Sequence, residues 1–150
     1  MRLFRLTLLA SIATIATLMS CGKQVPIEDP REDIVVSYST VAGSWELTWW
    51  NGTPLSDDTI LYIDLDRTER RFEMWDNIGS MYPVCTTGTF LLTAEEDGSY
   101  TLSGSYDHGV GDWNDEYRVE MLSADRMQWW SRTNGDVLDF TRIESIPELY

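Results

Sequence analysis

Hydrophobic and polar residues alternate with a period of two along most of the chain from Val41 onward. Turn-forming residues interrupt the alternation roughly every eight to twelve positions, a spacing typical of all-β sandwiches and barrels. In the stretch 61–66, for example, the leucines and the isoleucine share one face, and a tyrosine and two aspartates share the other. The pattern predicts strands over residues 45–49, 61–66, 71–75, 89–93, 100–106, 117–121, 127–129 and 137–143.

Two of the predicted connections are strong hairpin signals. Asp97-Gly98 and Asn134-Gly135 each lie between two predicted strands, and both dipeptides tolerate the positive φ angles of tight turns. No stretch combines a helical period with caps and sufficient length for a helix. About eight strands joined by short local connections favour an up-and-down antiparallel β-barrel over a Greek-key sandwich, because closure removes exposed sheet edges.

The N-terminal segment has a different pattern. Arg2 and Arg5 precede an apolar run that ends in Leu18-Met19-Ser20-Cys21, which resembles the lipobox of bacterial lipoprotein signal peptides. The apolar run is too short to span a bilayer comfortably, so a cleaved signal is favoured over a transmembrane helix. The resemblance implies that Cys21 becomes the lipidated first residue, carrying acyl chains such as palmitate. The alternative is an ordinary secretory signal with an incidental cysteine.

These features divide the chain into three parts. Residues 1–20 are expected to be the signal peptide, residues 21–37 the lipidated cysteine with a flexible tether, and residues 38–150 the barrel domain. The tether contains two prolines and alternating charges without an apolar period. We therefore expect a protein of the bacterial cell envelope, anchored to the outer membrane through Cys21, on a face that the sequence leaves open.

A short motif at the start of the first predicted strand points to a family. Gly43-Ser44-Trp45 resembles the Gly-x-Trp motif of lipocalins and their calycin relatives. In that superfamily a basic residue of the final strand packs on this tryptophan and closes one end of the barrel. Arg142 matches that residue in type and position, so Gly43, Trp45 and Arg142 are the expected closure residues. Over about residues 38 to 145 the chain looks like a short bacterial lipocalin-like lipoprotein.

Aromatic residues are the main candidates for binding. All seven tryptophans lie in the barrel domain, and two adjacent pairs must each place one member on either face of a strand. If the barrel is hollow, its walls would hold a small hydrophobic or amphipathic ligand, and the predicted ligand-binding residues are Trp49, Tyr117 and Trp129.

A second interpretation keeps the interior solid. The outward aromatic residues would then engage a glycan or a protein partner, and on the expected alternation these are Trp50, Trp75 and Trp130. An envelope inhibitor or accessory subunit is a third hypothesis, and an enzyme comes last.

Charge and reactive residues narrow the function further. After removal of residues 1–20 the chain carries nine basic and 25 acidic residues, a net charge of −16, which excludes nucleic acid as a partner. Cys85 has no histidine nearby in the sequence and reads as a small buried hydrophobe. The acidic segment 107–116 could hold Ca²⁺ but lacks an EF-hand pattern, and a solvated loop is favoured. No catalytic set is present, so we expect no enzyme activity, no cofactor and no metal.

Overall fold

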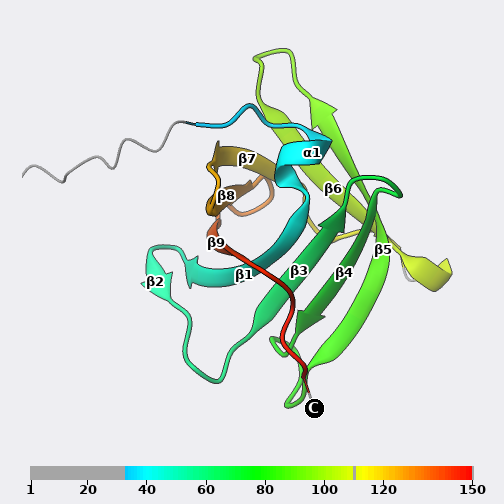
Figure 1. The fold of residues 1–150 in the computed structure, drawn as a ribbon, viewed down its shortest axis with the longest axis vertical. Coiled ribbons are helices and arrows are strands. Elements are labelled where there is room, and N and C mark those ends of the chain that lie inside the picture. The colour runs from blue at the N-terminus through cyan, green and yellow to red at the C-terminus, as the bar shows by residue number, and fades with distance from the viewer. Residues whose placement is uncertain (1–32, 110, 150) are drawn as a thin grey trace, which may run out of the picture. The chain divides into compact units, whose positions relative to one another are not determined.

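The strands form one antiparallel sheet whose first and last long strands pair with each other. A computed structural model of the protein describes residues 33–109 and 111–149. Strands follow one another in the sheet in the order β2-β1-β3-β4-β5-β6-β7-β8-β9, and a further β1–β9 pairing closes the barrel (Figure 1). The structure confirms the predicted all-β fold, an up-and-down barrel of eight strands to which β2 adds a two-residue strand along β1.

The strand boundaries agree with the predicted ones at most positions. The strands are β1 (Gly43–Trp50), β2 (Thr53–Pro54), β3 (Leu61–Asp66), β4 (Arg71–Asp76), β5 (Val84–Ala94), β6 (Tyr100–Tyr106), β7 (Tyr117–Leu122), β8 (Arg126–Ser131) and β9 (Val137–Ile143). Both predicted hairpins are present, and Gly98 and Gly135 adopt φ angles of 84° and 80° in their turns.

The helical content of the described residues is limited to single turns. Helix α1 (Tyr38–Val41) is one turn long, and Ser37 caps it by accepting a hydrogen bond from the Thr40 amide at 3.3 Å. The 3₁₀ turn η1 (Asp107–Gly109) follows β6. Neither of these turns, which are the helices found in the described residues, is long and apolar enough to cross a membrane.

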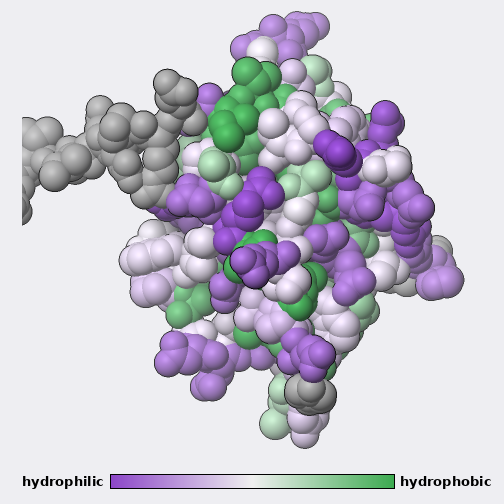
Figure 2. All heavy atoms as spheres, viewed as in Figure 1, coloured by the Kyte–Doolittle hydropathy of each residue, from purple (hydrophilic) through white to green (hydrophobic). Residues whose placement is uncertain are grey.

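The hydrophobic core fills one end and the middle of the barrel. Side chains that alternate along the strands point inward, and the largest fully buried ones are Trp45, Phe72, Phe140, Ile63, Leu65 and Leu102. Figure 2 shows that polar and charged side chains cover most of one outer face, with apolar side chains in small separate patches. This division between a dry interior and a charged exterior follows the period-two pattern of the sequence.

A β-bulge in β1 reverses the expected orientation of its tryptophan pair. The register to β9 shifts between Leu47 and Trp49, so Thr48 is an extra residue in the strand. Beyond the bulge, Trp50 packs against the core while Trp49 is 43% exposed. The prediction that Trp49 faces the interior and Trp50 faces out was therefore wrong, because strict alternation was extended through the bulge.

A second bulge lies in β7. The register to β8 shifts between Val119 and Met121, so Glu120 is the extra residue. Leu122 is consequently buried, where strict alternation places Met121 inside.

The described residues, 33–109 and 111–149, belong to one compact unit. The predicted signal peptide, residues 1–20, and most of the predicted tether, residues 21–37, lie outside the described residues. The proposed boundary at residue 38 therefore stays a prediction.

Candidate functional site

The two ends of the barrel are built differently, and the end nearest α1 is closed by an arginine and a tryptophan. The Arg142 guanidinium carbon lies 4.0 Å from the ring centroid of Trp45, which is fully buried. Arg142 donates hydrogen bonds to the carbonyl oxygens of Ala124 (2.7 Å), Ala42 (2.8 Å) and Thr40 (3.0 Å). The Trp45 indole N–H donates to the Val41 carbonyl at 2.9 Å. The arginine thus joins α1 and β9 across the end of the barrel.

Gly43 is required by this arrangement on two grounds. Its φ angle of 114° is rarely adopted by other residues, and a Cβ atom here would lie 2.6 Å from an Arg142 Nη1 atom. The Gly-x-Trp spacing therefore places Gly43 directly against the Arg142 guanidinium. Trp45, two residues later on β1, packs its ring against the same guanidinium.

The opposite end of the barrel holds a pocket of about 350 Å³. It lies among the ends of the strands farthest from Trp45, and its walls are mostly aromatic and aliphatic. The lining residues are Trp50, Leu61, Met74, Asp76, Ile78, Gly79, Tyr106, Trp113, Asn114, Tyr117, Trp129, Leu138 and Phe140. Its volume falls at the lower end of the range of small-molecule sites.

Aromatic rings in the pocket pack in a continuous cluster. The ring centroid of Trp129 lies 4.5 Å from that of Phe140 and 5.3 Å from that of Tyr117. Trp113 lies 6.1 Å from Trp129 and 5.1 Å from Phe72. These separations are typical of favourable aromatic pairs, so the cluster forms a rigid apolar wall.

Trp113 comes from the segment between β6 and β7 rather than from a strand. Strand β6 pairs with β7 through Thr101 and Leu102 alone, and residues 111–113 pair with the remainder of β6. The Trp113 amide donates to the Gly104 carbonyl at 2.7 Å. A Cβ atom at Gly104 would lie 2.2 Å from the indole, so the absent side chain makes room for Trp113.

Asp115 fastens the same segment to the hairpin between β8 and β9. Its carboxylate accepts hydrogen bonds from the Ser131 hydroxyl, from the Thr133 hydroxyl at 2.7 Å and from the Thr133 amide at 3.1 Å. Burial acts to raise the pKa of Asp115, but these hydrogen bonds outweigh it and the pKa is lowered. Residues 111–115, which belong to the segment predicted to be a solvated acidic loop, therefore form part of the barrel wall.

Two tyrosine hydroxyls of the pocket are shifted away from ionisation. Burial, followed by the charge of Asp115, raises the pKa of Tyr117 to about 12. Burial and the charge of Asp76 likewise raise the pKa of Tyr106. Both phenols stay neutral at physiological pH, so they contribute apolar ring surface and neutral hydroxyls to the pocket.

The structure brings two of the three predicted ligand-binding residues together. Tyr117 and Trp129 line the pocket as expected, whereas Trp49 lies outside it because of the β1 bulge. Sequence analysis missed Trp50 and Trp113 as lining residues. A Gly at 104 within a predicted strand was the available signal for Trp113, since a strand glycine marks close approach of another group.

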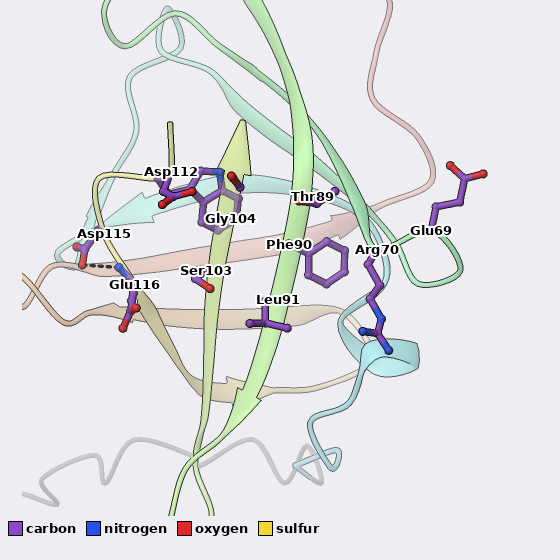
Figure 3. Close-up of a pocket in the computed structure, with 12 residues that line it drawn as sticks. Glu69, Arg70, Thr89, Phe90, Leu91, Ser103, Gly104, Asp112, Asp115 and Glu116 are labelled. Carbon is purple, nitrogen blue, oxygen red and sulfur yellow. Dashed lines mark hydrogen bonds between the residues drawn. The ribbon is translucent and has the colours of Figure 1, made fainter. Parts of the chain in front are cut away.

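A larger hollow of about 650 Å³ lies against β5 and β6, and Trp113 of the aromatic cluster is among its lining residues. Figure 3 shows Glu69 and Arg70 on one side of it and Asp115 and Glu116 on the other, where the Glu116 amide donates to Asp115 at 2.8 Å. Eight of its twelve lining residues are charged or carry a hydroxyl group. The smaller aromatic pocket is the better candidate site, because ligand sites are predominantly apolar with few polar groups.

The structure also places the acidic and thiol side chains that the sequence analysis considered for chemistry. Asp107 of segment 107–116 pairs with Arg71 and accepts from the Thr87 hydroxyl at 2.6 Å. No group of three or more His, Cys, Asp or Glu side chains within the described residues is placed to hold a metal ion. Cys85 is exposed, so its prediction as a buried residue was wrong: it sits on the outer face of β5 opposite Trp75. Desolvation and the charge of Glu73 raise the pKa of its thiol.

Comparison with known proteins agrees with this architecture. The sequence matches the family described as a lipocalin-like domain over residues 41–129. Among solved structures, a lipocalin-like protein from Bacteroides uniformis is 16% identical, with a TM-score of 0.49, covering 69% of this chain and 99% of that protein. No curated protein matches the chain.

Proposed function

The chain belongs to the lipocalin-like domain family, and from that premise we propose that its barrel binds a small hydrophobic or amphipathic ligand without catalysis. The observation that supports the proposal is the aromatic pocket of about 350 Å³ at one end of an otherwise filled barrel. Flat apolar walls favour a ring system or a short aliphatic chain, because burying apolar surface is the main source of affinity for such ligands.

The construction of the two ends supports the same proposal. At the closed end Arg142 packs on the ring of the fully buried Trp45, and both side chains complete the core. At the other end the indole N–H of Trp129 is buried and lacks a hydrogen-bond partner among the described residues, although its ring lines the pocket. A buried donor without a partner lowers stability, so an acceptor supplied by water would stabilise this end.

We further propose that lipid on Cys21 anchors the domain to the bacterial outer membrane. The lipobox-like Leu18-Met19-Ser20-Cys21 and the proline-containing segment behind it support this proposal. The membrane would then be one partner and the ligand another, while the net charge of the chain, −14, argues against binding to nucleic acid.

A second candidate function rests on exposed apolar side chains. Trp49 is 43% exposed, and Met81 and Tyr82 in the β4–β5 connection are 89% and 73% exposed. Such side chains could engage a glycan or a protein partner from the outer surface. The adjacent tryptophans of β1 separate the two functions, because Trp50 lines the pocket and Trp49 does not.

The experiment is native mass spectrometry of the purified protein with extraction of small molecules, followed by titration of tryptophan fluorescence. We expect a co-purifying or added apolar ligand to quench fluorescence, and Trp50→Ala to weaken its binding about tenfold or more. Trp49→Ala is the matched control and should bind with wild-type affinity. If Trp49→Ala lost binding and Trp50→Ala kept it, the ligand would occupy the outer surface and the second function would be favoured.

A further inference from the structure

The pocket at the open end carries negative charge that positive side chains do not balance. Of its lining residues one is ionisable at neutral pH, Asp76, and none is a lysine, arginine or histidine. A neighbouring hollow of about 270 Å³ shares Trp50 and Tyr117 with the pocket, and its charged lining residues are Asp115 and Asp136. One carboxylate therefore lines the aromatic pocket, and two more line the hollow beside it.

Neutral amide and hydroxyl groups donate the hydrogen bonds that the carboxylates of Asp115 and Asp136 accept. Asp136 accepts hydrogen bonds from the side-chain amides of Asn51 at 2.7 Å and Asn134 at 3.0 Å. These amides help to lower the pKa of Asp136, and hydroxyl groups do the same for Asp115. Both carboxylates keep their charge at neutral pH, because a carboxylate that accepts several hydrogen bonds resists protonation.

The positive charges of the described residues lie elsewhere. Residues 33–149 contain seven arginines and no lysine against 22 acidic residues. Arg142 is committed to the closed end, Arg71 pairs with Asp107, and Arg132 lies 3.2 Å from Glu95. None of the arginines lines the aromatic pocket. A ligand bearing a carboxylate or phosphate would enter a negative field without a partner, and burial would raise that cost further.

Aromatic ring faces and a carboxylate are together the groups that bind an organic cation. The quadrupole of an indole or phenol ring attracts a positive charge over its face, and the attraction grows where water is excluded. Trp50, Trp113 and Trp129 supply indole rings, Tyr106 and Tyr117 supply neutral phenols, and Asp76 supplies the counter-charge. Asp76 keeps one oxygen bonded to the Ile78 amide at 3.1 Å, which fixes the carboxylate at the pocket wall.

We propose that the pocket binds an organic ammonium ion with an apolar or aromatic body, whose charge is held by Asp76 and the surrounding rings. This inference rests on the proposed function, since it names the chemical class of the ligand for the same pocket. It excludes fatty-acid anions and other acidic amphiphiles as preferred ligands.

The test uses three naphthalene compounds of nearly equal size that differ in charge: 1-naphthylmethylammonium, 1-naphthalenemethanol and 1-naphthoate. Their affinities for the purified protein are measured by calorimetry and by quenching of tryptophan fluorescence at physiological salt. We expect the ammonium compound to bind about tenfold more tightly than the alcohol, and the carboxylate to bind most weakly.

Two variants on one strand locate the charge preference. Asp76→Asn keeps an oxygen for the Ile78 amide and should reduce the affinity for the ammonium compound about fivefold, with the alcohol changed less than about twofold. Glu73→Gln removes an exposed carboxylate from the opposite face of β4 and should leave all three affinities unchanged.

Each of the other possible results of this experiment contradicts one specific claim about the pocket. Equal affinity for all three compounds, or tightest binding of the carboxylate, would overturn the ammonium inference and leave the proposed function standing. An ammonium preference that survives Asp76→Asn would overturn the assignment of the counter-charge to Asp76. Failure of all three compounds to bind would count against the proposed ligand-binding function itself.

Discussion

The closed and open ends of this barrel use the same residue types for opposite purposes. At the closed end Trp45 is fully buried and its indole N–H bonds to Val41, while Arg142 bonds to three carbonyl groups. At the open end the indole N–H groups of Trp113 and Trp129 are buried and have no partner in the part of the chain that the structure describes, beside a pocket of about 350 Å³. The first end is optimised for stability, whereas the second retains unsatisfied groups and space, as binding sites do.

Trp45→Ala tests this contrast with the largest expected effect. Removing a fully buried tryptophan should lower the free energy of unfolding by about 3–5 kcal/mol, because it opens a cavity and leaves Arg142 without its ring. Chemical denaturation measures the change. Trp49→Ala, at a site 43% exposed, is the control and should cost far less. Similar losses for the two variants would show that the closed end does not carry the core.

Gly104→Ala tests whether Trp113 is packed as a fixed part of the open end. The added Cβ would lie 2.2 Å from the indole, so the ring must move, and overpacking of this kind costs about 1–3 kcal/mol. In a Trp113→Ala background the same substitution should cost clearly less, since the clash is gone. Gly79→Ala meets no atom within 4 Å and serves as the control. An additive double variant would mean that Trp113 does not rest on Gly104.

The contrast between the ends also separates what the sequence could predict from what it could not. Period-two alternation identified the barrel, and the Gly43-x-Trp45 motif placed a glycine and a tryptophan where Arg142 covers them. These features depend on the local pattern and on one pair of neighbouring residues, Trp45 of β1 and Arg142 of β9. The bulge at Thr48 is invisible to alternation, because one inserted residue exchanges the faces of Trp49 and Trp50.

The open end was harder to predict because its key residue lies in a polar segment. Trp113 is surrounded in sequence by aspartates, glycines and asparagine, which read as a solvated loop. Its burial depends on two distant features, the missing side chain at Gly104 and the anchoring of Asp115 by Ser131 and Thr133. Neither long-range contact leaves a periodic signal in the chain, and the glycine within the predicted strand was the one local sign of the first.

The substitution Asp115→Asn tests how the open end is anchored, and its expected effect on stability is smaller. The folded-state pKa of Asp115 is lowered, so its charge stabilises the protein above the unfolded-state value of about 4 and that contribution is lost as the pH falls through the folded-state pKa. We expect the variant to be about 1 kcal/mol less stable than the wild type at pH 7, after allowing for solvent screening. Urea denaturation should show the difference shrinking near pH 3. A difference independent of pH would show that the carboxylate charge does not anchor the segment.

Tyr117→Phe gives the smallest expected effect on stability near neutrality and the most specific spectroscopic one. The pKa of Tyr117 is raised to about 12, with burial as the main cause, so the folded state retains its proton while an unfolded tyrosine loses it near pH 10. Stability from this group is therefore fully present below about pH 10 and is lost as the pH rises through the folded-state value. Ultraviolet titration of phenolate should contain a component near pH 12 that Tyr117→Phe removes and that Tyr82→Phe, at a site 73% exposed, retains. Persistence of that component in Tyr117→Phe would assign it to another tyrosine, and Tyr117 would then not be the desolvated phenol that the aromatic pocket requires.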